Sequence, residues 1–324
     1  MRIGLIDVDG HNFPNLPLMK LSAWHKAKGD QVEWYYPLLS GHMDIVYMSK
    51  VFSFTPDYQY HIDADYVYRG GTGYCIKNAD GKEIYDRTQD SVLPEEVEHQ
   101  YPDYSLYGIE DTAYGYMTRG CPRNCDFCVV GKKEGCRTYT VAPLSEFWNG
   151  QKYIKLLDPN PIAAPEWKSN MQQLIDSKAY VDFTQGVDIR MMTEEKAEYL
   201  RKIKVKAVHF AWDRYGDKDM ILPKFEAFQK ITGWNRSKLI VYVLTNYNTT
   251  LEQDLERVYT LRALGYSPDV RIYEKYNLPE GHILRKLQRY VNSQPIFFTT
   301  NRFEDYKQLT EEQRKYVMTL RLST

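Results

Sequence analysis

The sequence lacks an apolar run that could span a membrane, for which about 20 residues are needed. Its first residues, Met1–Asp7, are too short an apolar stretch and too soon acidic for a secretory signal peptide, and they indicate a buried first strand instead. No excess of either charge is present, because 42 Lys and Arg face 43 Asp and Glu. Since nucleic-acid binders usually carry a basic excess, we expect a small-molecule or peptide substrate rather than a nucleic acid.

Cysteine is also scarce, with five among 324 residues. An odd, unevenly spread set does not suit a secreted disulfide framework, so we expect a cytoplasmic protein. Three of the five, Cys121, Cys125 and Cys128, crowd into one short segment. This crowding is the strongest local signal in the chain.

Residues 1–75 alternate short apolar runs with one helical stretch. Strands are expected at Ile3–Ile6, Gln31–Tyr35, Ile45–Tyr47 and Tyr66–Tyr68, and a helix at Leu16–Lys28. This pattern predicts a small α/β domain, short for a complete doubly wound (Rossmann-like) one. Residues 76–112 are polar and contain the turn signal Asp80-Gly81, so we expect them to connect two domains.

Residues 113–276 show a longer alternation of strands and helices. The expected strands are Ala113–Arg119, Tyr153–Leu157, Tyr180–Gln185, Lys206–Trp212, Leu239–Leu244 and Val270–Tyr273. The expected helices are Leu144–Asn149, Glu166–Ser177, Thr193–Ile203, Pro223–Thr232 and Thr250–Leu264. Six βα units in a row predict parallel strands in a partial (β/α)6 barrel. Residues 277–324 are expected to add a C-terminal helical segment, with a last helix at Leu309–Met318.

The cysteine segment follows the first barrel strand and has the spacing Cys-x3-Cys-x2-Cys, at Cys121, Cys125 and Cys128. Thiolates are soft ligands that suit iron–sulfur clusters or zinc. Three thiolates on one loop can hold three irons of a [4Fe–4S] cluster and leave the fourth iron open. The alternatives are a structural zinc ion, with Cys136, His11 or His209 as a fourth ligand, a disulfide, or three buried thiols. A zinc site would make the chain a non-catalytic binding protein.

The complete motif, Cys-x3-Cys-x-aromatic-Cys with Phe127 as the aromatic residue, resembles the signature of the radical S-adenosylmethionine (radical SAM) family. The preceding phrase Tyr114–Gly120 is similar to that of members with a cobalamin-binding-like domain in front. The resemblance implies a [4Fe–4S] cluster that cleaves SAM reductively to a 5′-deoxyadenosyl radical, which abstracts hydrogen from a substrate. It also implies an electron donor such as flavodoxin or ferredoxin.

The resemblance further implies SAM contacts at the strand ends, where barrel enzymes place their chemistry. Phe127 is expected against the adenine, Asp188 near the ribose, and Arg190 on the SAM carboxylate. The other expected contacts are Asp158, Asn160, Gln185, Asp213 and Asn246. Some of these are also ordinary turn residues, and Asp188 and Arg190 could instead pair with each other. No catalytic residue is assigned.

The front domain is similar to a shortened cobalamin-binding domain, with Asp-x-His spacing at Asp9-Gly10-His11. Pro14 stands where the cobalamin motif has glycine, and proline lacks the freedom that a close approach requires. We therefore expect no cobalamin, although a cobalamin-dependent methylase is an alternative within the same chemistry. A methylthiotransferase would need a second cluster, for which only Cys75 and Cys136 remain.

Overall fold

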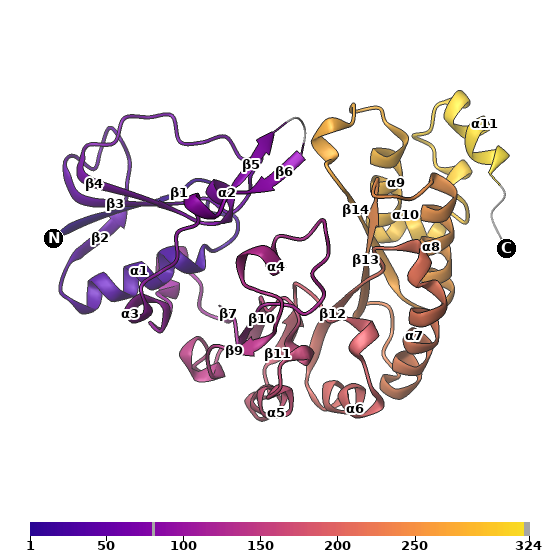
Figure 1. The fold of residues 1–324 in the computed structure, drawn as a ribbon, viewed down its shortest axis with the longest axis horizontal. Helices are drawn as coiled ribbons and strands as arrows, with labels where there is room; N and C mark the ends of the chain where they lie inside the picture. Colours follow the sequence, from indigo (N-terminus) through magenta and orange to yellow (C-terminus); the bar gives the residue numbers. More distant parts are fainter. Residues whose placement is uncertain (80–81, 321–324) are drawn as a thin grey trace.

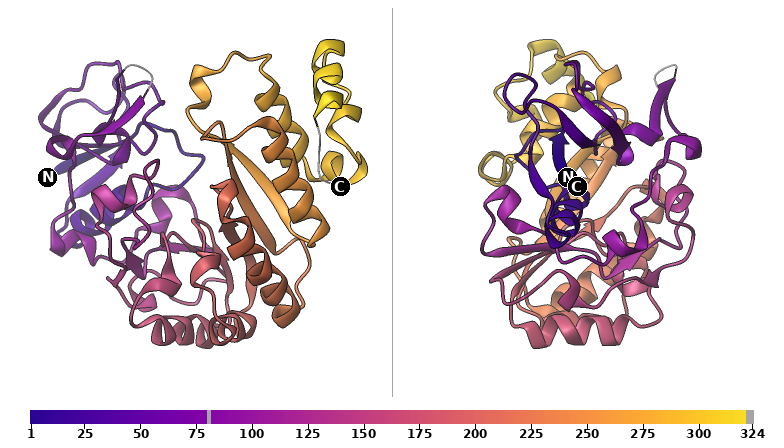
Figure 2. Two further views of the ribbon diagram at one scale, coloured as in Figure 1. Left: turned by 45° about the vertical axis from the view of Figure 1, so that its right-hand side comes forward. Right: turned by 90° about the vertical axis from the view of Figure 1, so that its left-hand side faces the viewer.

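The computed structural model describes residues 1–79 and 82–320. An N-terminal α/β part and a larger α/β part stand on two sides, and the segment with helix α4 (Val130–Lys133) lies between them (Figure 1). The same separation is visible after rotation (Figure 2). Within these described residues, no helix is both long enough and apolar enough to cross a membrane.

The N-terminal part is a four-stranded parallel sheet, in the order β2-β1-β3-β4. Its elements are β1 (Arg2–Asp7), α1 (Leu16–Ala27), β2 (Gln31–Trp34), β3 (Met43–Ser49) and β4 (Ala64–Gly70). Helix α1 begins at Asn15, whose side chain accepts a hydrogen bond from the backbone N–H of Leu18. One long helix for four strands confirms the truncated α/β architecture expected from the sequence.

The connecting segment contains only short elements. They are α2 (Thr72–Cys75), the antiparallel pair β5 (Ile76–Ala79) and β6 (Lys82–Tyr85), and α3 (Glu95–Glu98). The turn expected at Asp80-Gly81 lies outside the described residues.

The larger part is a six-stranded parallel sheet in the order β14-β13-β12-β11-β10-β7. The strands are β7 (Thr112–Gly115), β10 (Tyr153–Leu156), β11 (Tyr180–Phe183), β12 (Val205–Ala211), β13 (Leu239–Thr245) and β14 (Ser267–Ile272). All neighbours in this sheet pair in parallel. Strands β7 and β14 form its two edges, so the sheet is an open, partial barrel, as expected.

Helices follow the strands in the expected rhythm. They are α5 (Trp167–Ser177), α6 (Glu194–Lys202), α7 (Lys218–Thr232), α8 (Leu251–Ala263), α9 (Ile283–Asn292), α10 (Gln294–Thr299) and α11 (Glu311–Thr319). Helix α8 begins at Thr250 and α11 at Thr310, each with a reciprocal capping box to a glutamine three residues later. The last helix is therefore confirmed.

Three local expectations were wrong. The first barrel strand does not run through to Arg119, because it ends at Gly115 and a separate strand β8 (Thr118–Arg119) pairs with β9 (Tyr139–Thr140). The helix expected at Leu144–Asn149 is only a short 3₁₀ turn. Helix α7 starts before Pro223, because a proline in the second turn removes one hydrogen bond without preventing the first turn from forming.

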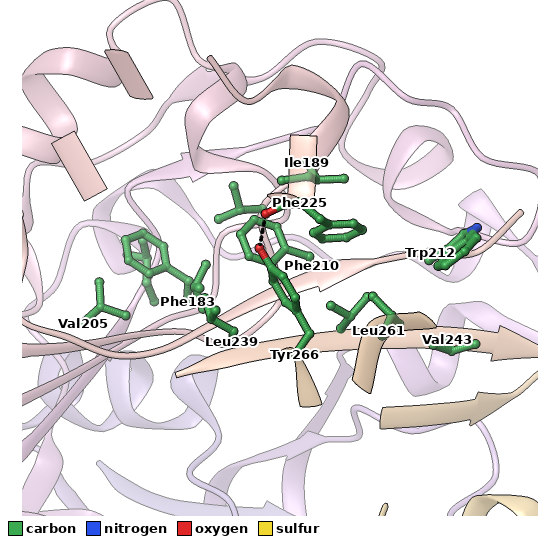
Figure 3. Packing of buried hydrophobic residues seen from close by; sticks show 14 of the residues in the cluster. Phe183, Ile189, Val205, Phe210, Trp212, Phe225, Leu239, Val243, Leu261 and Tyr266 are labelled. Atoms are coloured by element: carbon green, nitrogen blue, oxygen red, sulfur yellow. Dashed lines mark hydrogen bonds between the residues drawn. The ribbon is translucent and has the colours of Figure 1, made fainter. Parts of the chain in front are cut away.

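The main core lies between the six-stranded sheet and its helices. Phe210, Phe225 and Tyr266 are fully buried there, and the Tyr266 hydroxyl donates to the Phe225 carbonyl oxygen at 2.8 Å (Figure 3). Burying the tyrosine hydroxyl with this partner avoids the cost of an unpaired polar group. Leu16 and Met19 of α1 belong to the same core, so the N-terminal helix packs against the barrel.

Candidate metal centre at the barrel edge

The loop with the three cysteines leaves strand β8 and is closed at its base. Gly120 has φ +74, and a Cβ atom there would lie 2.0 Å from the carbonyl oxygen of Arg137. Only glycine allows this close approach of two backbones. The N–H of Cys121 donates to the carbonyl oxygen of Gly135 at 3.2 Å, and the Thr138 hydroxyl donates to the Gly120 carbonyl oxygen at 3.1 Å. The loop is therefore held as a unit.

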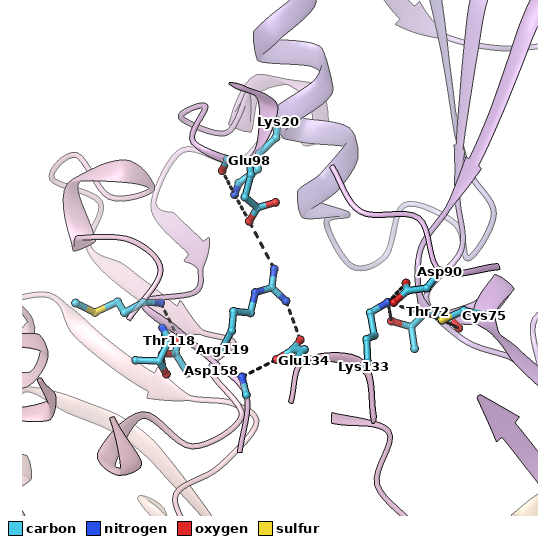
Figure 4. Close-up of polar contacts among 12 residues, drawn as sticks. Lys20, Thr72, Cys75, Asp90, Glu98, Thr118, Arg119, Lys133, Glu134 and Asp158 are labelled. Atoms are coloured by element: carbon cyan, nitrogen blue, oxygen red, sulfur yellow. Dashed lines mark hydrogen bonds and ion pairs between the residues drawn. The ribbon is translucent and has the colours of Figure 1, made fainter. Parts of the chain in front are cut away.

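Ion pairs fix this loop against the connecting segment (Figure 4). Arg119 lies between Glu98 and Glu134, with its nitrogens 3.6 and 3.0 Å from their carboxylates. Lys133, at the end of α4, is 2.8 Å from the Asp90 carboxylate and 3.8 Å from the buried Cys75 sulfur. The spare thiol Cys75 is thus packed inside a contact between the two parts.

Cys121, Cys125 and Cys128 are free, half-buried thiols. Burial is the main cause that raises the pKa of all three. The charge of Cys121 also raises the pKa of Cys125 and Cys128, and the charge of Cys125 raises the pKa of Cys128. Arg123 acts in the opposite direction on Cys121, as Arg190 does on Cys125. Three neighbouring thiols beside two cations fit a group that binds them as thiolates.

Three thiolate donors on one loop suit an iron–sulfur cluster by their chemistry. Among the described residues, no three His, Cys, Asp or Glu side chains converge closely enough to hold one metal ion. Zinc draws its sulfur ligands to about 2.3 Å, whereas each cluster thiolate binds a different iron. Two of the three proposed fourth zinc ligands lie elsewhere: His11 stacks on Trp34 at 4.1 Å, and His209 contacts the Phe183 carbonyl oxygen at 3.0 Å. The third, Cys136, is exposed, and its sulfur lies 3.8 Å from the Gly131 carbonyl oxygen. The zinc hypothesis gains no support from this arrangement.

Asp158 and Asn160, after β10, have different environments. The Asp158 carboxylate is buried and accepts from the N–H groups of Met117 at 2.9 Å and Thr118 at 2.6 Å and from the Thr118 hydroxyl at 2.5 Å. Burial raises the pKa of Asp158 to about 7. This geometry favours a structural role for Asp158, holding the break before β8, over the SAM contact suggested by the sequence. The Asn160 amide nitrogen lies 4.0 Å from the Cys121 sulfur.

The polar residues after β11 form the internal pair that the sequence offered as an alternative. Arg190 donates to Asp188 at 2.7 Å and to Asp217 at 2.9 Å. The second Asp188 oxygen has no hydrogen bond but lies 3.4 Å from the Nε of Arg123, within the cysteine loop. Gln185 is exposed at the same strand end. Asp188 therefore links the third strand to the cysteine loop.

The ends of β12, β13 and β14 complete the edge. Burial raises the pKa of Asp213 to about 6, although Arg190 and Arg257 lower it. Asn246, with φ +63, donates to the Tyr273 carbonyl oxygen at 2.9 Å. This hydrogen bond joins the end of β13 to the end of β14. Asp213, after β12, is half-buried.

Aromatic rings run from the cysteine loop to the last strand. Phe127 meets Tyr247 edge to face, and Tyr247 meets Tyr273 in the same way, each with ring centroids 5.0 Å apart. The Asp126 carboxylate lies 3.3 Å from Arg214 and 3.4 Å from the Tyr247 hydroxyl. The contacts of Arg123, Asp126 and Tyr247 were not predicted from the sequence. Arg123 and Asp126 lie between the motif cysteines, and this position was a signal that they belong to the site.

Two solved structures of the radical S-adenosylmethionine methyltransferase TsrM from Kitasatospora setae are similar to this structure. One, with cobalamin and a [4Fe–4S] cluster bound, has a TM-score of 0.56 and 11% identity over 84% of this chain and 74% of that chain. The other, with tryptophan and the SAM analogue aza-SAM, has a TM-score of 0.55 and 11% identity over 84% and 72%. The chain has the fold of these radical SAM enzymes. No family model and no curated protein matches it.

The shared radical SAM fold confirms the resemblance seen in the cysteine motif. It gives no support to the expectation that cobalamin is absent, because the solved structure with this fold has cobalamin bound. In this chain, Asp9 of the Asp-x-His segment accepts from the Phe52 N–H at 3.3 Å and the Thr55 hydroxyl at 2.6 Å, so it shapes the loop after β3.

Proposed function

We propose that this chain is a radical SAM enzyme that binds a [4Fe–4S] cluster through Cys121, Cys125 and Cys128. The observation on which the proposal rests is that the cysteine loop lies beside the polar ends of three successive strands, β10, β11 and β12. Such a cluster supplies, when bound and reduced, the electron that breaks the C5′–S bond of SAM to give methionine and a 5′-deoxyadenosyl radical. The cofactor provides this chemistry, while the chain binds and orients the reactants.

The cations of the site have two roles in this proposal. Arg123 and Arg190 offset the negative charge of the thiolates, since each lowers the pKa of a cysteine. Arg190 uses Nε and Nη1 for Asp188 and Asp217, and a guanidinium has further donors for the SAM carboxylate. Arg123, whose side chain is 40% exposed, is a second candidate for that contact.

The remaining contacts follow from the shape of the edge. Phe127, Tyr247 and Tyr273 form an aromatic wall against which the adenine can pack. Asn160, Gln185, Asp213 and Asn246 are the proposed polar contacts to SAM or substrate. The proposed substrate is a small molecule or peptide, and flavodoxin or ferredoxin is the proposed electron donor in a reducing cytoplasm.

The test is anaerobic purification followed by iron and sulfide analysis and an assay for 5′-deoxyadenosine after reduction with SAM. C125A is expected to lose the cluster and all SAM cleavage. C136S is the matched control, because Cys136 is exposed and lies outside the motif. A wild-type protein without iron, or equal iron in both variants, would refute the proposal.

Cobalamin-dependent methyl transfer is a second candidate. The observation that favours it is the TsrM structure, which has the same fold and cobalamin bound. Hydroxocobalamin titrated into the purified protein would change its visible absorption on binding. A spectrum identical to that of free hydroxocobalamin would reject this candidate and leave the radical SAM proposal intact.

A further inference from the structure

A second polar site lies at the amino-terminal ends of the strands of the six-stranded sheet, opposite the cysteine loop. It is a concave pocket of about 360 Å³, lined by Lys152, Tyr153, Tyr180, Val205, Lys206, Ser237 and Lys238. Tyr153, Tyr180 and Val205 are the first residues of β10, β11 and β12, and Lys238 immediately precedes β13. The cysteine loop faces the carboxyl ends of these strands. We call this group the basic tyrosine pocket.

Lysine ammonium groups surround the two tyrosine rings of the pocket. Those of Lys206 and Lys152 lie 4.8 and 5.2 Å from the Tyr153 ring centroid, and that of Lys204 lies 5.8 Å from the Tyr180 centroid. The two rings are tilted, with centroids 5.8 Å apart, and Tyr180 is 44% exposed. The pocket thus offers both cations and an aromatic face.

These lysines have no ion-pair partner in the part of the chain that the structure describes. Ion pairs there include Lys20, Lys26, Lys77, Lys133, Lys168 and Lys218, but none of the lysines around the pocket. Like charges gathered in a concavity repel each other, because low-dielectric walls focus their field. An uncompensated group of lysines in a concavity therefore attracts anions.

The pocket could not be predicted from the sequence, because its lysines are distant from one another in the chain. In the sequence alone, Lys204 and Lys206 resemble a solvated helix end, because they lie within four residues of the end of α6. Parallel pairing of β10, β11, β12 and β13 brings Lys152 and Lys238 to the same edge. The basic patch exists only in the folded chain.

We propose that the basic tyrosine pocket binds a phosphorylated nucleoside, with its base stacked on Tyr180 or Tyr153 and its phosphate held by the lysines. The pocket has the volume of a small-molecule site. Aromatic rings with interleaved cations are the combination that recognises nucleotides, because the ring meets the base and the cation meets the phosphate. The nucleotide is either free or part of a single strand, and the site is independent of the proposed SAM chemistry.

The test measures binding of two probes to the full chain by fluorescence anisotropy: labelled AMP and a short labelled single-stranded RNA. Binding of either supports the pocket if the variants below weaken it. If the RNA binds at least ten-fold tighter than AMP, the ligand of the pocket is a single-stranded nucleic acid. If the two affinities are comparable, the ligand is a free nucleotide. Each lost phosphate contact should also reduce the salt dependence of strand binding, by about 0.7 in the log–log slope.

The K206Q/K238Q variant removes two charges, and the Y180L variant removes one ring. Each variant should weaken binding about ten-fold. Y180F keeps the ring and should bind as the wild type does. K315Q is the control for the loss of a surface charge, because Lys315 is an exposed lysine on α11 that does not line the pocket. Helix α11 is the last helix of the chain (Figure 1). Thermal unfolding of each variant confirms that it is folded.

Three results would overturn the proposal. The first is the absence of binding by either probe. The second is unchanged binding in K206Q/K238Q and Y180L, which would place the probe elsewhere, for example at the cysteine edge. The third is displacement of labelled AMP by inorganic phosphate or polyglutamate as effectively as by unlabelled AMP, since the pocket would then recognise charge alone.

Discussion

Arg257 of helix α8 is a buried cation whose removal has a calculable cost. Its side chain is fully buried and lies 2.5 Å from the carboxylate of Asp254, which is also buried. It donates to the carbonyl oxygens of Trp212 at 2.6 Å and Leu244 at 2.7 Å. These carbonyls stand at the ends of β12 and β13, so Arg257 holds together the two strand ends that present Asp213 and Asn246.

The variant R257M leaves the Asp254 charge unpaired and at least two carbonyl oxygens without a donor. Breaking one partner of a buried ion pair costs about 3 to 5 kcal/mol. A buried acceptor left without its partner adds about 1 kcal/mol or more, partly relieved if water enters. We therefore expect the free energy of unfolding of R257M to fall by at least about 4 kcal/mol.

The assay is urea unfolding of R257M, D254L and the double variant R257M/D254L. Replacing both partners removes the unpaired charge, so the double variant should lose about 2 kcal/mol less than the sum of the single losses. R201M is the matched control, because Arg201 forms an ion pair of the same i,i+3 spacing with Glu198 on the exposed surface of α6. Its loss should stay below about 1 kcal/mol.

Two results would refute this reasoning. A loss below about 1 kcal/mol in R257M would mean that the pair is solvated, contrary to its burial. Strict additivity of the two single variants would mean that Arg257 and Asp254 do not interact in the folded chain.

Two further predictions concern the loop and its support. Asp158, with a folded pKa of about 7 against a usual 3.8, keeps a proton that the unfolded chain releases. Its contribution to stability is thus present below about pH 4 and is lost as the pH rises toward 7, about 3 kcal/mol between about pH 5 and pH 8. Urea unfolding should show this loss in the wild type but not in D158N; parallel pH profiles would contradict it. G120A forces a Cβ to within 2.0 Å of a backbone oxygen, whereas Gly135, also at positive φ, has no atom within 4 Å of its Cβ position. Tm and iron content should therefore fall more in G120A than in G135A, and equal losses would contradict the close approach.

Much of the fold could be predicted because its signals are local. Apolar runs separated by helical periods located the six strands of the larger sheet and the four of the smaller one. Boundaries were less accurate where a distant side chain decides them. Asp158, for example, interrupts the first barrel strand by accepting from Met117 and Thr118, 40 residues earlier in the chain. No local sequence pattern predicts the contact between Asp158 and these two residues.

The sequence predicted the loop that carries the three cysteines, and it predicted the contacts around this loop less well. The spacing of the three cysteines predicted the loop, since a tight turn holds neighbouring thiols together. Asp254 and Arg257 share the apolar face of α8 with Leu251, Leu255 and Val258, so their spacing was a signal of burial that the sequence reading did not use. Asp188 and Arg190 were expected on SAM, and the structure pairs them with each other.

The sequence by itself determined the positions of the strands along the chain and the cysteine loop, because strand periodicity and ligand spacing are properties of neighbouring residues. Only the tertiary structure decided which charges meet. Parallel pairing placed Lys152, Lys206 and Lys238 at one edge of the sheet and brought Asp188 to Arg123 at the other. Contacts of this kind depend on the register between distant segments, which packing of the whole core sets.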